Sequence, residues 1–169
     1  MLKRRILEPE TPPKTTGETL AFAALSGLRS MAAPALLARA IRRGDVADPK
    51  GTPYYLLGRL SPLLQLLMVG EMVGDKTPFI PSRTSAGPLL GRAASGALVA
   101  AAMRASGGRG DKGSAALLGA LSAAAAAFAG ENLRTQGAQR LGVPDLALAL
   151  LEDGLVLVAG TRLLRRGGQ

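Results

Sequence analysis

Single charged residues interrupt several long apolar stretches of this sequence. Arg29 is the one charge in the stretch 19–38. Later apolar stretches contain the charged residues Glu71, Arg92, Glu131, Glu152 and Asp153. In a soluble amphipathic helix charges recur every turn on one face, whereas isolated charges in apolar runs are typical of polar groups inside a membrane bundle. The pattern therefore predicts a small integral membrane protein with a charged interior.

The charged side chains could form a polar centre shared by several helices. Glu71 and Asp75 are four residues apart, so their carboxylates lie on one face of a helix. An isolated charge in a bilayer costs at least about 2.5 kcal/mol, so Arg29 requires an acidic partner. Glu152 and Asp75 are the candidates. The complete candidate centre is Arg29, Glu71, Asp75, Arg134, Glu152 and Asp153.

Two interpretations of this centre remain open. In the first, the charges line a path for an ion, a proton or a polar solute, because ionisable groups within membrane helices are usually functional. In the second, the same charges form ion pairs between helices and fix the register of the bundle. The choice decides between transport and a structural role.

The composition excludes several kinds of catalytic site. The chain has no Cys and no His, so it lacks disulfides, thiol nucleophiles, imidazole bases and the common zinc sites. The Gly-rich segment 106–113 does not match a phosphate-binding loop, because Lys112 is followed by Gly113. Two carboxylates on one helix also fall short of a Mg²⁺ or Ca²⁺ coordination shell. We expect a protein that is not an enzyme and binds no cofactor or metal.

The hydrophobic pattern predicts an all-α polytopic membrane bundle of about five helices, with four as the alternative. The predicted spans are 18–39, 56–75, 88–104, 114–134 and 144–164. Turn-rich segments containing Gly and Pro separate them. Residues 1–17 form a Pro-rich exposed tail, and residues 18–166 form a single transmembrane domain.

Composition supports a lipid bilayer as the main partner. Hydrophobic residues make up 47% of the 169 residues, and the segment 113–130 carries no charge. That segment approaches the roughly 20 residues that cross a bilayer. The net charge of +9 is dispersed and aromatic residues are only 3%, so we expect no nucleic-acid partner, although a soluble basic helical protein is a minor alternative. A homodimer is one candidate assembly, and the solute or ion is not identified.

Small residues and basic residues give two further expectations. Close helix packing is predicted at Gly70 and Gly74, at Gly87 and Gly91, and along 123–130. Counting basic residues on alternate sides of five spans favours an amino end outside and a carboxyl end inside the cell.

Two pairs of spans suggest an inverted repeat. Leu28-Arg29-Ser30 in the first span is similar to Leu133-Arg134-Thr135 in the fourth, and an acidic span accompanies each. With three crossings between them, the two pairs would run in opposite directions, as in many small transporters.

The motifs together resemble an uncharacterised family of small bacterial integral membrane proteins, a domain of unknown function. The motifs are Gly27-Leu28-Arg29, Glu71 with Asp75, Lys76 and Pro78, a span opened near Pro88, and Pro144 followed by Leu151-Glu152-Asp153. The resemblance covers 27–160, and its most specific element is the E-x-x-x-D-K-x-P block. The fourth span departs from it, with Glu131 and Asn132 where members often have His or Lys. The resemblance implies a multi-pass protein of the bacterial inner membrane and no particular substrate.

These observations predict a small transporter- or channel-like membrane protein. The alternative is a membrane scaffold or accessory subunit that does not transport, in which the same charges hold helices together or meet a partner's helix.

Overall fold

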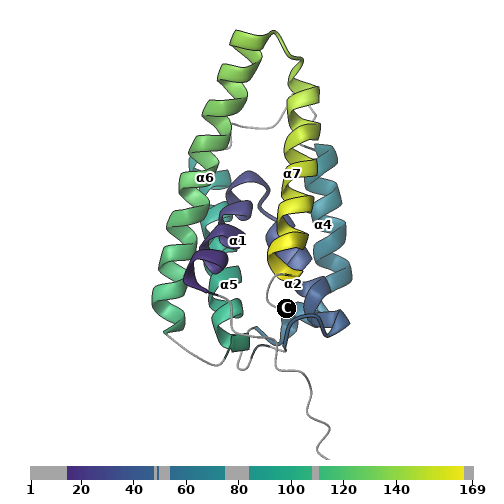
Figure 1. The fold of residues 1–169 in the computed structure, drawn as a ribbon, viewed down its shortest axis with the longest axis vertical. Coiled ribbons are helices and arrows are strands. Elements are labelled where there is room, and N and C mark those ends of the chain that lie inside the picture. Colours follow the sequence, from purple (N-terminus) through teal and green to yellow (C-terminus); the bar gives the residue numbers. More distant parts are fainter. Residues whose placement is uncertain (1–14, 48, 50–53, 75–83, 108–110, 166–169) are drawn as a thin grey trace, which may run out of the picture.

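The computed structural model describes residues 15–47, 49, 54–74, 84–107 and 111–165 of the chain. These residues form seven α-helices and no strand, which confirms the predicted all-α class. Figure 1 shows how the helices are arranged. They are α1 (Thr16–Leu28), α2 (Ala32–Arg43), α3 (Leu56–Arg59), α4 (Ser61–Gly74), α5 (Ala86–Gly107), α6 (Lys112–Leu141) and α7 (Asp145–Arg165).

The first predicted span, 18–39, is not one helix. It is divided into α1 and α2 by an extended residue, Arg29, with φ −138° and ψ 111°. The physical reason is Pro34, which lacks an N–H and whose ring would clash with the carbonyl of Ser30 in a continuous helix. The prediction of a single crossing at this point is therefore wrong.

Helices α1 and α2 form a hairpin whose ends lie at the same end of the molecule (Figure 1). The beginning of α1 contacts the end of α5, where Arg104 Nη2 donates to Thr16 Oγ1 at 2.5 Å. The end of α2 lies beside the end of α7, where both line one cavity. We call this end, where α1 and α6 begin and α2, α5 and α7 end, the lower end. The first predicted span therefore does not carry the chain from one end to the other, as the alternate-side counting assumed.

The four later predicted spans correspond to the remaining helices. The second is interrupted at Leu60, between α3 and α4, and its last residue, Asp75, lies outside the described residues. The fourth predicted span continues to Leu141 as part of α6. Asp111 caps α6 by accepting from the backbone N–H groups of Ser114 at 2.7 Å and Gly113 at 3.1 Å. These hydrogen bonds to Ser114 and Gly113 lower the pKa of the Asp111 carboxyl.

Backbones of α1, α5 and α6 approach each other at small residues. A Cβ at Gly96 of α5 would lie 2.5 Å from the carbonyl oxygen of Gly119 of α6, and a Cβ at Gly27 would lie 2.0 Å from that of Ala123. The predicted packing along 123–130 agrees with this, since Ala123 and Ala127 are fully buried. The prediction for Gly70, Gly87 and Gly91 is wrong, because a Cβ there would meet nothing within 4 Å.

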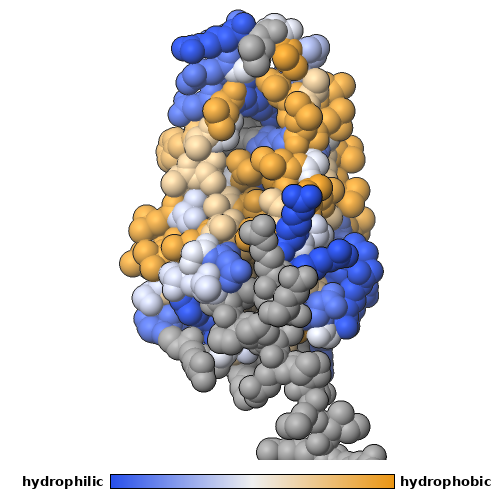
Figure 2. Space-filling view, in the orientation of Figure 1, coloured by the Kyte–Doolittle hydropathy of each residue, from blue (hydrophilic) through white to orange (hydrophobic). Residues whose placement is uncertain are grey.

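Two helices in the described part are long and apolar enough to cross a membrane by length and composition, Ala86–Gly107 and Lys112–Arg140. Helix α4 is apolar but has 14 residues. Helix α7 has 21 residues but carries Glu152 and Asp153 in its middle. Apolar side chains cover the middle of the face drawn in Figure 2, and hydrophilic residues lie toward both ends. The described helices thus carry an apolar surface between two polar ends.

Candidate functional site

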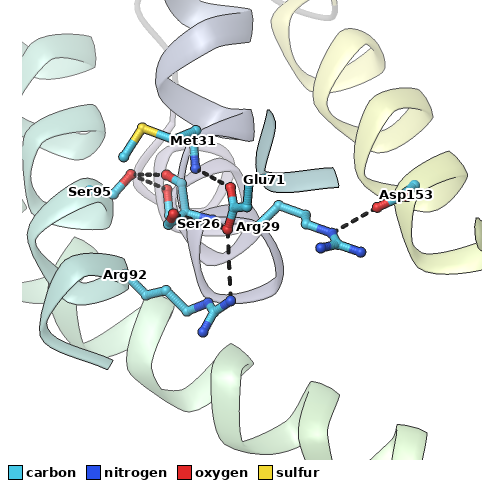
Figure 3. Close-up of polar contacts among 8 residues, drawn as sticks. Ser26, Arg29, Met31, Glu71, Arg92, Ser95 and Asp153 are labelled. Atoms are coloured by element: carbon cyan, nitrogen blue, oxygen red, sulfur yellow. Dashed lines mark hydrogen bonds and ion pairs between the residues drawn. The ribbon is translucent and has the colours of Figure 1, made fainter. Parts of the chain in front are cut away.

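Arg29 lies at the turn of the α1–α2 hairpin and is fully buried. Its Nε lies 2.7 Å from Oδ1 of Asp153 in α7, and the Asp153 side chain is 11% exposed (Figure 3). The expected carboxylate partner does come from the fifth predicted span. The printed distance is to Asp153, a predicted member of the polar centre; of the two residues named as candidates, Glu152 is its neighbour in α7 and Asp75 lies outside the described residues.

Glu71 of α4 caps the beginning of α2 from outside that helix. Its Oε1 accepts from the backbone N–H of Ser30 at 2.7 Å and from Ser30 Oγ at 3.0 Å, while its Oε2 accepts from the N–H of Met31 at 2.8 Å. The first N–H groups of a helix have no partner within the helix and carry partial positive charge, so a carboxylate is favourable there. The N-cap residue Met31 supplies no side-chain cap itself. Glu71 therefore stabilises the hairpin turn.

Helix α5 completes the site with two residues. Arg92 is 5% exposed, and its Nη2 lies 3.7 Å from Glu71 Oε1. The hydroxyl of Ser95 makes a short hydrogen bond to the carbonyl oxygen of Ser30 and lies 3.2 Å from Ser26 Oγ. Both the N–H and the C=O of Ser30 therefore have partners from other helices, as buried backbone groups require.

We call the four charged residues Arg29, Glu71, Arg92 and Asp153 the charged centre. It contains two cations and two anions from the hairpin turn, α4, α5 and α7, so its formal charge is zero. Arg92 and Ser95 were not among the predicted site residues. The signal for Arg92 was present, because it is a lone charge in an apolar stretch, whereas nothing in the sequence distinguished Ser95.

The other predicted site residues lie elsewhere. Arg134 makes a bidentate ion pair with Asp145, the first residue of α7, whose side chain is 63% exposed. Asp145 precedes Asp153 by eight residues, or about 12 Å along α7. Glu152 is half-buried, and its Oε1 would lie 3.6 Å from a Cβ at Gly130 of α6. Asp75 lies outside the described residues.

The two arginine motifs of the suggested repeat have different local structures. Arg29 is an extended residue between two helices, whereas Arg134 lies within the continuous helix α6. The described residues thus give no support to a repeat at these motifs.

Comparisons of the chain with protein families, with curated proteins and with solved structures found no match. The resemblance to a family of small membrane proteins stays a prediction.

Proposed function

We propose that the chain is an integral membrane protein that uses its charged centre in transport. The supporting observation is that charged side chains are buried while large apolar side chains are exposed, the reverse of the distribution in a soluble protein. Arg29 is fully buried, while Leu66 of α4, Leu133 of α6 and Leu151 of α7 are 68%, 72% and 69% exposed. Such large exposed apolar surfaces are rare on soluble monomers but suit contact with lipid.

In the proposed arrangement, the segment 56–74 that contains α3 and α4 crosses the membrane, as do α5, α6 and α7, and α1–α2 is a re-entrant hairpin. The 21 residues of α7 span about 31 Å, close to the thickness of the hydrocarbon layer. A re-entrant turn is tolerated at membrane depth where its backbone is buried in protein, as the contacts of Ser30 with Glu71 and Ser95 allow. The beginning of α1 and the end of α7 then lie on one side.

The described basic residues favour a cytoplasmic location for the lower end. There, the helices carry Arg39, Arg42, Arg43, Arg59, Arg104, Lys112, Arg162 and Arg165. Toward the opposite end, α6 carries Arg134 and Arg140. Cytoplasmic loops of membrane proteins are enriched in Lys and Arg. With the family resemblance, this supports a multi-pass protein of the bacterial inner membrane.

Labelling of single cysteines tests this arrangement, because the chain has no native Cys. Gly17→Cys, in the first turn of α1, and Ala47→Cys, after the end of α2, are at exposed positions and are expected to react with a membrane-impermeant maleimide only after cells are opened. Gln139→Cys, exposed near the end of α6, is expected to react in intact cells. Labelling of Gly17→Cys and Ala47→Cys from opposite sides would contradict the hairpin. Release of the protein by alkaline carbonate would contradict membrane insertion.

The charged centre resembles a transport site in its position. Many transporters place the N-terminus of a broken helix at mid-membrane, where its N–H groups bind an anionic part of the solute. In the proposed arrangement the N-terminus of α2 lies at such a depth, and the Glu71 carboxylate accepts hydrogen bonds there. Displacement of the Glu71 carboxylate would free these N–H groups for an anionic part of a solute. We therefore propose a small polar solute as the cargo.

A scaffold or accessory subunit is the second candidate, and one observation favours it. The charged centre, as the described residues form it, contains two cations and two anions and is electrically balanced. Charges that satisfy each other in this way can serve to fix how the hairpin fits between α4, α5 and α7.

Flux measurements in liposomes separate the two functions. Under the transport proposal, the purified protein moves protons, potassium, phosphate or small carboxylates, and Glu71→Gln reduces that flux at least about tenfold because the charge is lost. Asp145→Asn is the matched control, since its carboxylate pairs with Arg134 away from the centre. Melting in detergent must show that both variants are folded. Absence of flux for the whole panel, with loss of a co-purifying protein in Glu71→Gln, would favour the accessory subunit.

A further inference from the structure

A cavity of about 610 Å³ lies at the lower end between the last turns of α2 and α7. The helices meet above it at Gly160, where a Cβ would lie 2.5 Å from Leu36 Cδ1. The cavity is lined by Leu36, Arg39, Ala40, Arg43, Asp45, Thr161, Leu164 and Arg165. Its volume falls within the range of small-molecule sites, roughly 300–1,000 Å³.

Three arginines face this cavity with one carboxylate. Arg39 and Arg43 are four residues apart on α2, so they share one face, and Arg165 comes from the last turn of α7. With Asp45, the lining has a formal charge of +2 from three cations and one anion. Among the residues that the structure describes, these three arginines make no ion pair. Helix dipoles favour cations at the ends of α2 and α7. They do not explain why cations of two helices converge on one cavity.

The lining also has an apolar part. Leu36, Ala40 and Leu164 are buried at 6%, 6% and 9% exposure, while the three arginines are exposed. A cavity with guanidinium groups outside and aliphatic side chains beneath matches a phosphate ester attached to an apolar group. Guanidinium groups bind phosphate oxygens in bidentate fashion, and phosphate draws arginines of like charge together.

We propose that this cavity binds the phosphate of an anionic phospholipid headgroup. Basic pockets between transmembrane helices on the cytoplasmic side suit such headgroups, and the lower end is the basic end of the molecule. The lipid source depends on the membrane arrangement proposed for the chain, whereas binding of a phosphate anion by the cavity does not. Neither depends on transport.

Two double variants with the same charge test this site. Arg39→Gln with Arg165→Gln removes one cavity arginine from each helix. Arg42→Gln with Arg162→Gln also removes one exposed arginine from each helix. Each lies three positions from the replaced cavity arginine of its helix, and neither lines the cavity. The detergent-solubilised full chain is titrated with short-chain phosphatidylglycerol, with short-chain phosphatidylcholine and with inorganic phosphate, and the melting temperature is recorded.

Phosphatidylglycerol is expected to raise the melting temperature of the wild type and of Arg42→Gln/Arg162→Gln, with phosphatidylcholine having little effect. In Arg39→Gln/Arg165→Gln the apparent affinity is expected to fall at least about tenfold, since charge-assisted hydrogen bonds are lost. An equal effect of inorganic phosphate with the same dependence on these arginines would support the anion site and identify free phosphate as the source. No rise in the wild type, or equal weakening in both double variants, would overturn the proposal.

Discussion

Replacing Asp153 with leucine is expected to lower the free energy of unfolding by about 3–5 kcal/mol, because it removes the carboxylate from a buried ion pair. Arg29, fully buried and 2.7 Å from that carboxylate, cannot release its proton. Arg29→Met is expected to cost less, since the Asp153 side chain that remains is 11% exposed, whereas the Arg29 side chain is fully buried. The double variant should recover part of the loss. Thermal melting of the four proteins in detergent, analysed as a double-mutant cycle, measures the coupling.

The pair Arg134–Asp145 is the control for this cycle. Because Asp145 is largely exposed, Arg134→Met, Asp145→Leu and their combination should show a coupling of no more than about 1 kcal/mol. If the stability losses of the Arg29 and Asp153 variants are additive in the double variant, the two side chains do not stabilise each other, and the buried ion pair is contradicted. A coupling at Arg134–Asp145 as large as that at Arg29–Asp153 would contradict the difference in burial.

Glu71→Ala is expected to destabilise the chain by about 3 kcal/mol or more, because Ser30 N–H, Ser30 Oγ–H and Met31 N–H all lose their acceptor. Glu71→Gln keeps one acceptor oxygen and should fall between alanine and the wild type. Hydrogen exchange gives a local measurement, since amides in the first turn of α2 should exchange faster in both variants.

Gln65→Ala on the same helix is the matched control. Gln65 Nε2 donates only to Ser61 Oγ within α4 in the described contacts, at 2.9 Å, so its loss should cost about 1 kcal/mol or less. Unchanged exchange at Met31 in Glu71→Ala would show that the carboxylate does not hold the hairpin turn.

The helices were predictable from the sequence because Ala- and Leu-rich runs are separated by Gly- and Pro-rich segments. The division at Arg29 was missed, since the residue that forces it, Pro34, acts on a carbonyl four residues earlier and lies inside an apolar run. Read as a helix breaker, Pro34 would have indicated two short helices here.

The charged centre was predictable only in part. Neighbouring helix positions point about 100° apart, so choosing between Glu152 and Asp153 required the rotation of α7, which packing at Gly160 against Leu36 helps to set. Arg134 lies away from the charged centre for another reason. Helix α6 continues to Leu141, so Arg134 is placed beside the start of α7 at Asp145.

The hairpin turn also constrains the order of biogenesis. Its polar groups are completed by residues made much later in translation, Glu71 and Ser95, which follow Ser30 by 41 and 65 positions. Asp153, the partner of Arg29, follows by 124. In the proposed membrane arrangement, the turn would expose bare amides and a guanidinium to lipid until those helices have entered the bilayer. The α1–α2 hairpin would therefore reach its final position only after helices that follow it in the chain.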